Sequence, residues 1–297
     1  MVNESTSTQY MQKDRVGKTL EEFTDVFTDI SNHLIFEKDI IEESQLKDGP
    51  TESIYKAADG TNYREQRRDT VKYVEDMGIQ IALLGLENQS SVNNDMAIRM
   101  MGYDYASYRS QIDQGKHRYP VVSSVLYFGD EKWDKAKSLW EIVNPPKDLQ
   151  DKFNDYKINL IDVPRLPEEV RDKLTSDFRV VADFFANKDK DGYKPDDKVL
   201  DHPEEVLDLF RIFTSDDRFR DIEEKTITKI HEGGEVQMCD FIDRMEQKGF
   251  EKGREKEVFD SVFENDYSVE RGAEKLNISK DEFEAKYQSW LEERNKQ

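Results

Sequence analysis

The sequence contains little cysteine, few histidines and no long apolar run. Cys239 is the single cysteine among 297 residues, so no internal disulfide can form, and we expect a reducing, cytoplasmic environment. The four histidines are scattered without the spacing of zinc ligands. Since no run of about 18 apolar residues occurs, we expect no membrane-spanning helix. Residues 1–16 have no apolar core, so we expect a disordered leader rather than a secretory signal.

Positive charge is also in deficit. The chain has 44 Lys and Arg against 65 Asp and Glu, a net charge of −21. A uniformly acidic surface repels phosphate backbones, so the overall balance argues against nucleic-acid binding unless a local basic cluster overcomes it. Hydrophobic residues make up 36% of the chain and include 16 Phe, 13 Tyr and 3 Trp, which is enough to build the core of one large or two smaller domains.

Periodicity predicts an α/β fold, with an open mixed sheet flanked by helices and an α-helical C-terminal region. The predicted helices cover residues 18–36, 93–109, 170–185, 203–213 and 226–247. The predicted strands cover 70–74, 79–89, 119–128 and 157–163, and Met77-Gly78 is expected at the tip of a hairpin between the first two. We expect a core over 17–166, a helical extension over 167–248 and a charged helical tail over 249–297.

The second strand of the predicted hairpin ends in three polar residues, Glu87, Asn88 and Gln89. Alternation along a strand places Glu87 and Gln89 on one face and Asn88 on the other. If the two strands pair, Asp69 at the start of the first strand lies near Glu87 at the end of the second. The sequence therefore predicts that two carboxylates meet at one edge of the sheet.

Two facing carboxylates repel each other unless a positive charge lies between them. A hard divalent cation such as Mg²⁺, with Mn²⁺ as its substitute, meets that need, because it binds one or two carboxylates and leaves other positions to water and phosphate oxygens. Gln89 could orient a water molecule or a phosphate oxygen. The pattern alone is weak, and a solvated strand end remains the alternative interpretation.

Several stretches together resemble a known family. They are "RRDTVKYV", "IALLGLENQSSVNNDMAIRMMGYDY" and "YPVVSSVLYFGDEKW", followed by "DYKINLIDV" and a glycine-spaced charged segment, "MCDFIDRMEQKGFEKGREKE". This pattern resembles the recombination-promoting nuclease and transposase-like family, a branch of the PD-(D/E)XK nuclease superfamily. The resemblance covers most of residues 20–257 and is specific between residues 64 and 133.

The resemblance implies a PD-(D/E)XK-type core and a metal-dependent DNA endonuclease that hydrolyses phosphodiester bonds. Asp69, Glu87 and Gln89 would form the catalytic site, with Mg²⁺ held by Asp69 and Glu87. Gln89 stands where the superfamily usually has Lys, as is common in the family. In the superfamily an acidic residue of the first helix sometimes joins the site, and Asp25 is the candidate here; a solvated helix position is the alternative.

A local basic cluster flanks the predicted carboxylates despite the acidic total. Arg64, Arg67 and Arg68 precede Asp69, and Arg99 lies on the following helix. Phosphate oxygens are bound by such residues, so these four arginines are the predicted DNA phosphate contacts.

Two alternatives stay open for the whole chain and for its tail. The chain could instead be a catalytically inactive nuclease-fold protein that acts as a protein-interaction module. In the tail, residues 268–287 outline two helices around Asn277-Ile278, but acidic residues outnumber basic ones, so we favour a dimerisation element over a DNA-reading motif. We accordingly expect DNA and a second copy of the chain as partners.

Overall fold

The computed structural model describes residues 20–56, 63–76, 78–115, 117–190, 193–195, 197–214, 219, 228, 234–264 and 266–294. Within these ranges only the backbone is described for 52–56, 63–67, 79, 81, 212, 239–249, 251–252 and 293. The chain forms two compact units, Met1–Met238 and Cys239–Gln297.

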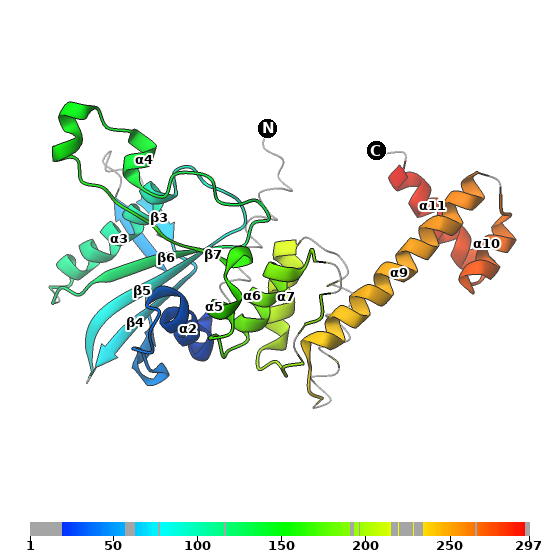
Figure 1. Cartoon of the computed structure of the whole chain (residues 1–297), viewed down its shortest axis with the longest axis horizontal. Coiled ribbons are helices and arrows are strands. Elements are labelled where there is room, and N and C mark those ends of the chain that lie inside the picture. The colour runs from blue at the N-terminus through cyan, green and yellow to red at the C-terminus, as the bar shows by residue number, and fades with distance from the viewer. Residues whose placement is uncertain are drawn as a thin grey trace. The chain divides into compact units, whose positions relative to one another are not determined.

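The first unit is built on a five-stranded mixed sheet with the strand order β1-β4-β5-β6-β7 (Figure 1). β1 pairs antiparallel with β4 and β4 antiparallel with β5, whereas β5–β6 and β6–β7 are parallel. A separate antiparallel pair, β2–β3, lies between β1 and β4 in sequence. The strands are β1 (Leu46–Asp48), β2 (Glu52–Lys56), β3 (Tyr63–Arg67), β4 (Thr70–Asp76), β5 (Ile79–Gln89), β6 (Val121–Tyr127) and β7 (Asn159–Asp162).

The β4–β5 hairpin fixes which residues meet at the edge of the sheet. Thr70 pairs with Leu86, and this register continues as far as Val74 opposite Ala82. Beyond that point Glu75 pairs with Gln80, so β5 holds one extra residue and forms a bulge. Gly78 has φ +78° in the turn, a left-handed conformation that glycine adopts without steric cost.

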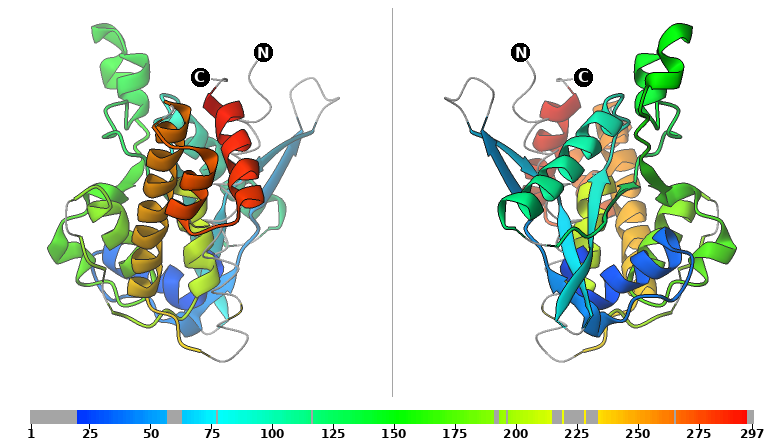
Figure 2. Two further views of the ribbon diagram at one scale, coloured as in Figure 1. Left: turned by 90° about the vertical axis from the view of Figure 1, so that its right-hand side faces the viewer. Right: turned by 90° about the vertical axis from the view of Figure 1, so that its left-hand side faces the viewer.

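Helices cover both faces of this sheet. Figures 1 and 2 show α3 (Met96–Asp113) on one face and α2 (Thr24–Ile30) with α6 (Phe178–Asn187) on the other. α3 supplies the crossover between the parallel strands β5 and β6, a connection that a parallel pair requires. Residues of β5 therefore alternate between two buried environments.

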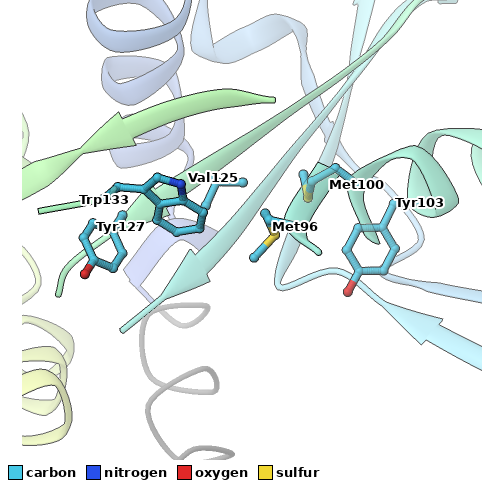
Figure 3. Close-up of a cluster of buried hydrophobic side chains, with 6 residues drawn as sticks. All are labelled: Met96, Met100, Tyr103, Val125, Tyr127 and Trp133. Atoms are coloured by element: carbon cyan, nitrogen blue, oxygen red, sulfur yellow. The ribbon is translucent and has the colours of Figure 1, made fainter. Parts of the chain in front are cut away.

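The α3 face carries an apolar cluster of buried side chains (Figure 3). Its members come from α3, from β6 and from the loop after β6: Met96, Met100, Tyr103, Val125, Tyr127 and Trp133. The spacing of four and three along α3 puts its three members on one stripe, so burial of this stripe fixes the rotation of the helix against the sheet. On the opposite face Phe128 contacts Phe178 and Phe185 of α6.

The remaining elements of the first unit are short or follow the sheet. They are the helical turn at 20–22, η1 (Ser31–Ile35), η2 (Glu43–Gln45), α4 (Leu139–Val143), η3 (Lys147–Lys152), η4 (Val163–Arg165), α5 (Glu168–Arg171) and α7 (Pro203–Thr214). In the part of the chain that the structure describes, no helix is both long and apolar enough to cross a bilayer.

The second unit consists of helices with a core of their own. It comprises nearly all of α9 (Met238–Phe263) with α10 (Val269–Leu276) and α11 (Lys280–Arg294). Phe259, Ala273 and Phe283 are buried in its core, and Tyr287 and Trp290 pack against them. Asn277 takes a left-handed conformation at the end of α10, which stops the helix and allows α11 to begin.

The predicted α/β class and mixed sheet flanked by helices are confirmed, and β5 has the predicted bounds of 79–89. The single helix predicted over 170–185 is wrong, because residues 172–177 interrupt it between α5 and α6. The single helix predicted over 226–247 is also wrong, because residues 234–237 are not helical and α9 begins only at Met238; residues 226, 227 and 229–233 lie outside the described residues. The expected leader at 1–16 and Met77 at the hairpin tip lie outside them as well.

Candidate active site

Asp69 lies beside the end of β5, opposite the polar sequence that closes this strand. The backbone N–H of Asn88 donates a hydrogen bond to Asp69 Oδ2 at 2.7 Å. The register of the β4–β5 hairpin produces this contact, because Thr70 already pairs with Leu86. Asp69 also borders a cavity of about 330 Å³, with walls formed by Glu22, Asp48, Gly49, Thr51, Asp69, Thr70, Val71 and Lys72.

Glu87 and Gln89 share the α3 face of β5. The side-chain Nε2 of Gln89 lies 3.4 Å from Glu87 Oε1 and donates a second hydrogen bond to the Asn88 carbonyl at 2.8 Å. Both residues are almost completely buried, with Glu87 1% exposed and Gln89 0%. Within the described part of the chain, Gln89 Oε1 accepts no hydrogen bond. This amide oxygen is thus available to a cation or to a water molecule.

Arg99 and Tyr103 of α3 reach the same carboxylate. The Arg99 guanidinium forms an ion pair with Glu87, and its Nε donates to the Tyr103 hydroxyl at 2.9 Å. Burial lowers the pKa of Arg99, but the charge of Glu87 together with Tyr103 and Asp69 outweighs this effect, so the pKa lies above its ordinary value. Burial and then the charge of Glu87 raise the pKa of Tyr103 to about 12. Arg99 is therefore fully protonated and Tyr103 is neutral at physiological pH.

A third carboxylate, that of Glu21, approaches the edge from the opposite face of the sheet. Glu21 lies in the helical turn before α2 and is 0% exposed. Burial raises its pKa well above the ordinary 4.5, and the charge of Asp69 adds to this effect. The side chains of Asn88 and Thr70 lie close enough to oppose the shift in part. A buried carboxylate beside another one favours its protonated form unless a cation is present.

Asp25, the predicted acid of the first helix, has a different neighbour. His202 Nε2 lies 3.1 Å from both carboxylate oxygens of Asp25, and the ring of His202 stacks on Phe23. Glu21, four residues earlier, is buried where the charges of Asp69 and Glu87 raise its pKa. The structure thus pairs Asp25 with His202 and places Glu21 beside the predicted site.

Arg68, predicted to contact phosphate, is buried in the interface between the sheet and α3. Its Nη2 donates to Asp104 Oδ1 at 2.9 Å, and the residue is 4% exposed. Asp104 also accepts hydrogen bonds from Ser123 Oγ at 2.5 Å and from the Tyr156 hydroxyl at 2.6 Å. We call this set, Arg68, Asp104, Ser123 and Tyr156, the Asp104 network. It holds the residue before Asp69 against α3, β6 and the segment before β7.

The other two arginines of the predicted basic cluster, Arg64 and Arg67, lie on β3. Their backbones pair with Tyr55 and Glu52 of β2. Their side chains lie outside the described residues, so their contact with phosphate stays a prediction.

The donor set at this edge fits a hard divalent cation bound by two protein carboxylates. Among the described residues, no three His, Cys, Asp or Glu side chains converge as a metal-binding group. The sheet accounts for this, because Glu21 and Glu87 approach from opposite faces. Mg²⁺ commonly uses only one or two carboxylates and fills its other positions with water and phosphate oxygens. Asp69, Glu87 and the buried Gln89 oxygen are compatible with that coordination.

The fold and the site define an α/β protein with an acidic, amide-bearing edge on a mixed sheet. The comparison with protein families agrees with the sequence resemblance. Residues 80–185 match the family described as "Putative transposase, YhgA-like", which confirms the similarity to this nuclease-related family over β5, α3, β6 and the segments as far as α6. No curated protein and no solved structure shows significant similarity to the chain.

Sequence reasoning missed Glu21 and the Asp104 network. Glu21 gives no local signal, since a charged residue in a helical pattern is ordinarily exposed. Gly85 did give a signal, because a glycine inside a strand of large apolar residues often marks the close approach of another group. A Cβ atom added at Gly85 would lie 3.2 Å from Arg68 Cδ, so the glycine makes room for the Arg68 stem.

Proposed function

We propose that this chain is a metal-dependent DNA endonuclease with a PD-(D/E)XK-type core that hydrolyses phosphodiester bonds. The observation that carries the proposal is the hydrogen bond from the backbone N–H of Asn88, the residue after Glu87, to the Asp69 carboxylate at the end of the β4–β5 hairpin, with Gln89 on the same face as Glu87. The family similarity over residues 80–185 supports it. The order of elements, a helix, antiparallel strands, a crossover helix and a parallel strand, is compatible with such a core.

Each residue of the proposed site would have a distinct role. Asp69 and Glu87 would hold Mg²⁺, and the Gln89 amide would orient the attacking water or a phosphate oxygen. When bound, Mg²⁺ lowers the pKa of water and stabilises charge on the phosphorus centre. Because Gln89 is neutral, stabilisation of negative charge by the protein falls to nearby arginines, and Arg99, which pairs with Glu87, is a candidate.

Plasmid nicking tests the proposal. Wild type should nick supercoiled plasmid with Mg²⁺ and not with EDTA, and Glu87→Ala should lose at least about 100-fold in rate, since one of the two carboxylates is removed. Asp76→Ala is the matched control, because Asp76 is an exposed acid at the far end of the same hairpin. Crystals soaked in Mn²⁺ should show anomalous density between Asp69 and Glu87. Equal nicking by wild type and Glu87→Ala would refute the assignment.

One observation favours a second candidate, a nuclease-fold protein without catalysis that acts as an interaction module. Arg99 forms an ion pair with Glu87 within the chain, so this carboxylate is stabilised without a metal ion. The two candidates differ in cation binding, which isothermal titration of Mn²⁺ measures directly. Self-association, through the second unit or elsewhere, stays a prediction that sedimentation analysis can check.

A further inference from the structure

The Arg99–Glu87 ion pair joins a buried carboxylate to a partly exposed guanidinium. Glu87 is 1% exposed and sits on a central strand, whereas the Arg99 side chain is 34% exposed on the first turns of α3. Arginine reaches its partner through a long flexible stem, so Arg99 can change partners while Glu87 stays in place. The carboxylate expected to hold the cation is thus already engaged by a group that is able to leave.

We propose that Arg99 is an exchangeable counter-ion of Glu87 that couples DNA binding to cation binding. Without DNA, Arg99 neutralises Glu87 and weakens the affinity of the site for a divalent cation. When a DNA phosphate draws the guanidinium away, Glu87 becomes available to the cation. This inference rests on the proposed nuclease function and adds a mechanism by which the substrate regulates the site.

The surroundings of Arg99 support such an exchange. A guanidinium binds a phosphate with two parallel hydrogen bonds, as it does a carboxylate, so the two acceptors compete for the same donors. The Tyr103 hydroxyl lies 3.4 Å from Glu87 Oε1 and remains beside the carboxylate when Arg99 leaves. Asp69 also contributes negative charge at Arg99, so a cation bound between the carboxylates would repel the guanidinium toward the phosphate.

Thermodynamic reciprocity makes the inference measurable. If DNA raises the affinity for the cation by some factor, the cation must raise the affinity for DNA by the same factor. Removal of Arg99 should break this coupling, because Glu87 is then available in both states. A merely structural role of Arg99 would change stability and leave the coupling intact.

The experiment is isothermal titration of Mn²⁺ into the full chain, with and without a phosphorothioate DNA duplex, which resists hydrolysis. Without DNA, Arg99→Ala should bind Mn²⁺ about tenfold more tightly than wild type, within the usual range of coupling between sites. The duplex should raise the Mn²⁺ affinity of wild type by a similar factor and leave that of Arg99→Ala nearly unchanged. Arg99→Lys keeps the positive charge and should bind weakly without DNA, as wild type does.

Arg211→Ala is the matched control. Arg211 is 33% exposed and pairs with Asp208 on its own helix at 2.6 Å, so this change removes the same charge and a similar contact elsewhere. It should leave Mn²⁺ affinity at the wild-type value. Circular dichroism of each variant verifies folding, and Arg99→Lys provides the test if Arg99→Ala fails to fold: its affinity should still respond to DNA.

Failure of this inference differs from failure of the proposed function. If Mn²⁺ binds in a manner abolished by Glu87→Ala, but wild type and Arg99→Ala have equal affinities without DNA, the counter-ion role of Arg99 is overturned and the nuclease proposal stands. If neither wild type nor any variant binds Mn²⁺, with or without DNA, both the counter-ion role of Arg99 and the nuclease proposal are overturned.

Discussion

The contacts of the Asp104 network predict that Asp104→Ala strongly lowers the free energy of unfolding. Asp104 is 15% exposed and accepts hydrogen bonds from the buried Arg68, from Ser123 and from Tyr156. Asp104→Ala removes all three acceptor contacts and leaves the Arg68 guanidinium buried without its carboxylate. Loss of one partner of a buried ion pair costs about 3–5 kcal/mol, and each neutral hydrogen bond about 1 kcal/mol. Because these contributions overlap, we expect the free energy of unfolding to fall by about 4 kcal/mol.

Urea denaturation followed by tryptophan fluorescence measures this change. Trp133 is buried in the apolar cluster on the α3 face, so a background with Trp140→Phe and Trp290→Phe leaves it as the sole tryptophan of the chain. The control is Asp113→Ala on the same helix, which breaks an exposed pair with Arg109 and should cost about 0.5 kcal/mol or less. Equal losses for the two variants would refute the reasoning.

A double replacement distinguishes the loss of the Arg68–Asp104 ion pair from the cost of leaving the Arg68 charge buried without a partner. Arg68→Met combined with Asp104→Leu removes both charges and keeps much of the apolar volume, so it should be more stable than Asp104→Ala. If the double variant is instead less stable than Asp104→Ala, the buried guanidinium is not the source of the loss.

Two further predictions concern pH and the second unit. The pKa of Glu21 is raised above 4.5 in the folded chain, so stability is greatest below that value and falls as pH rises through the raised pKa. In EDTA, Glu21→Gln should therefore melt at a higher temperature than wild type at alkaline pH and converge with it near pH 4.5; a constant difference would contradict this. In Gly272→Ala, the added Cβ would lie 2.5 Å from Phe283 Cζ, which should cost about 1–3 kcal/mol. In variants that retain only Trp290 or only Trp133, the Trp290 fluorescence transition should shift and that of Trp133 should not.

Local patterns sufficed to predict the central elements from the sequence. Periodicity predicted the strand over 79–89, which is β5, and the helix over 93–109, which overlaps most of α3. The meeting of Asp69 with the end of β5 followed from pairing two adjacent strands. These features depend on residues close in sequence, where periodicity and hairpin geometry leave few alternatives.

Features that depend on distant partners could not be predicted in this way. β2 and β3 are rich in charged residues and lack the alternation of a half-buried strand. The burial of Arg68 depends on Asp104, 36 residues later, so its positive charge alone suggested a surface contact. Likewise, the partner of Arg99 depends on the rotation of α3 over β5, which only tertiary packing sets.

The bulge between Val74 and Glu75 divides the β4–β5 hairpin into two independent segments. Toward the carboxylates, any one-residue slip would move Asp69 away from the Asn88 amide and turn its neighbours to the wrong side. Toward the Gly78 turn, an irregular pairing already tolerates a mismatch in strand length. Insertions of a residue or two at this tip should therefore be accommodated locally, which makes it a suitable place to attach an epitope or a fluorophore without disturbing the chemistry at the other end.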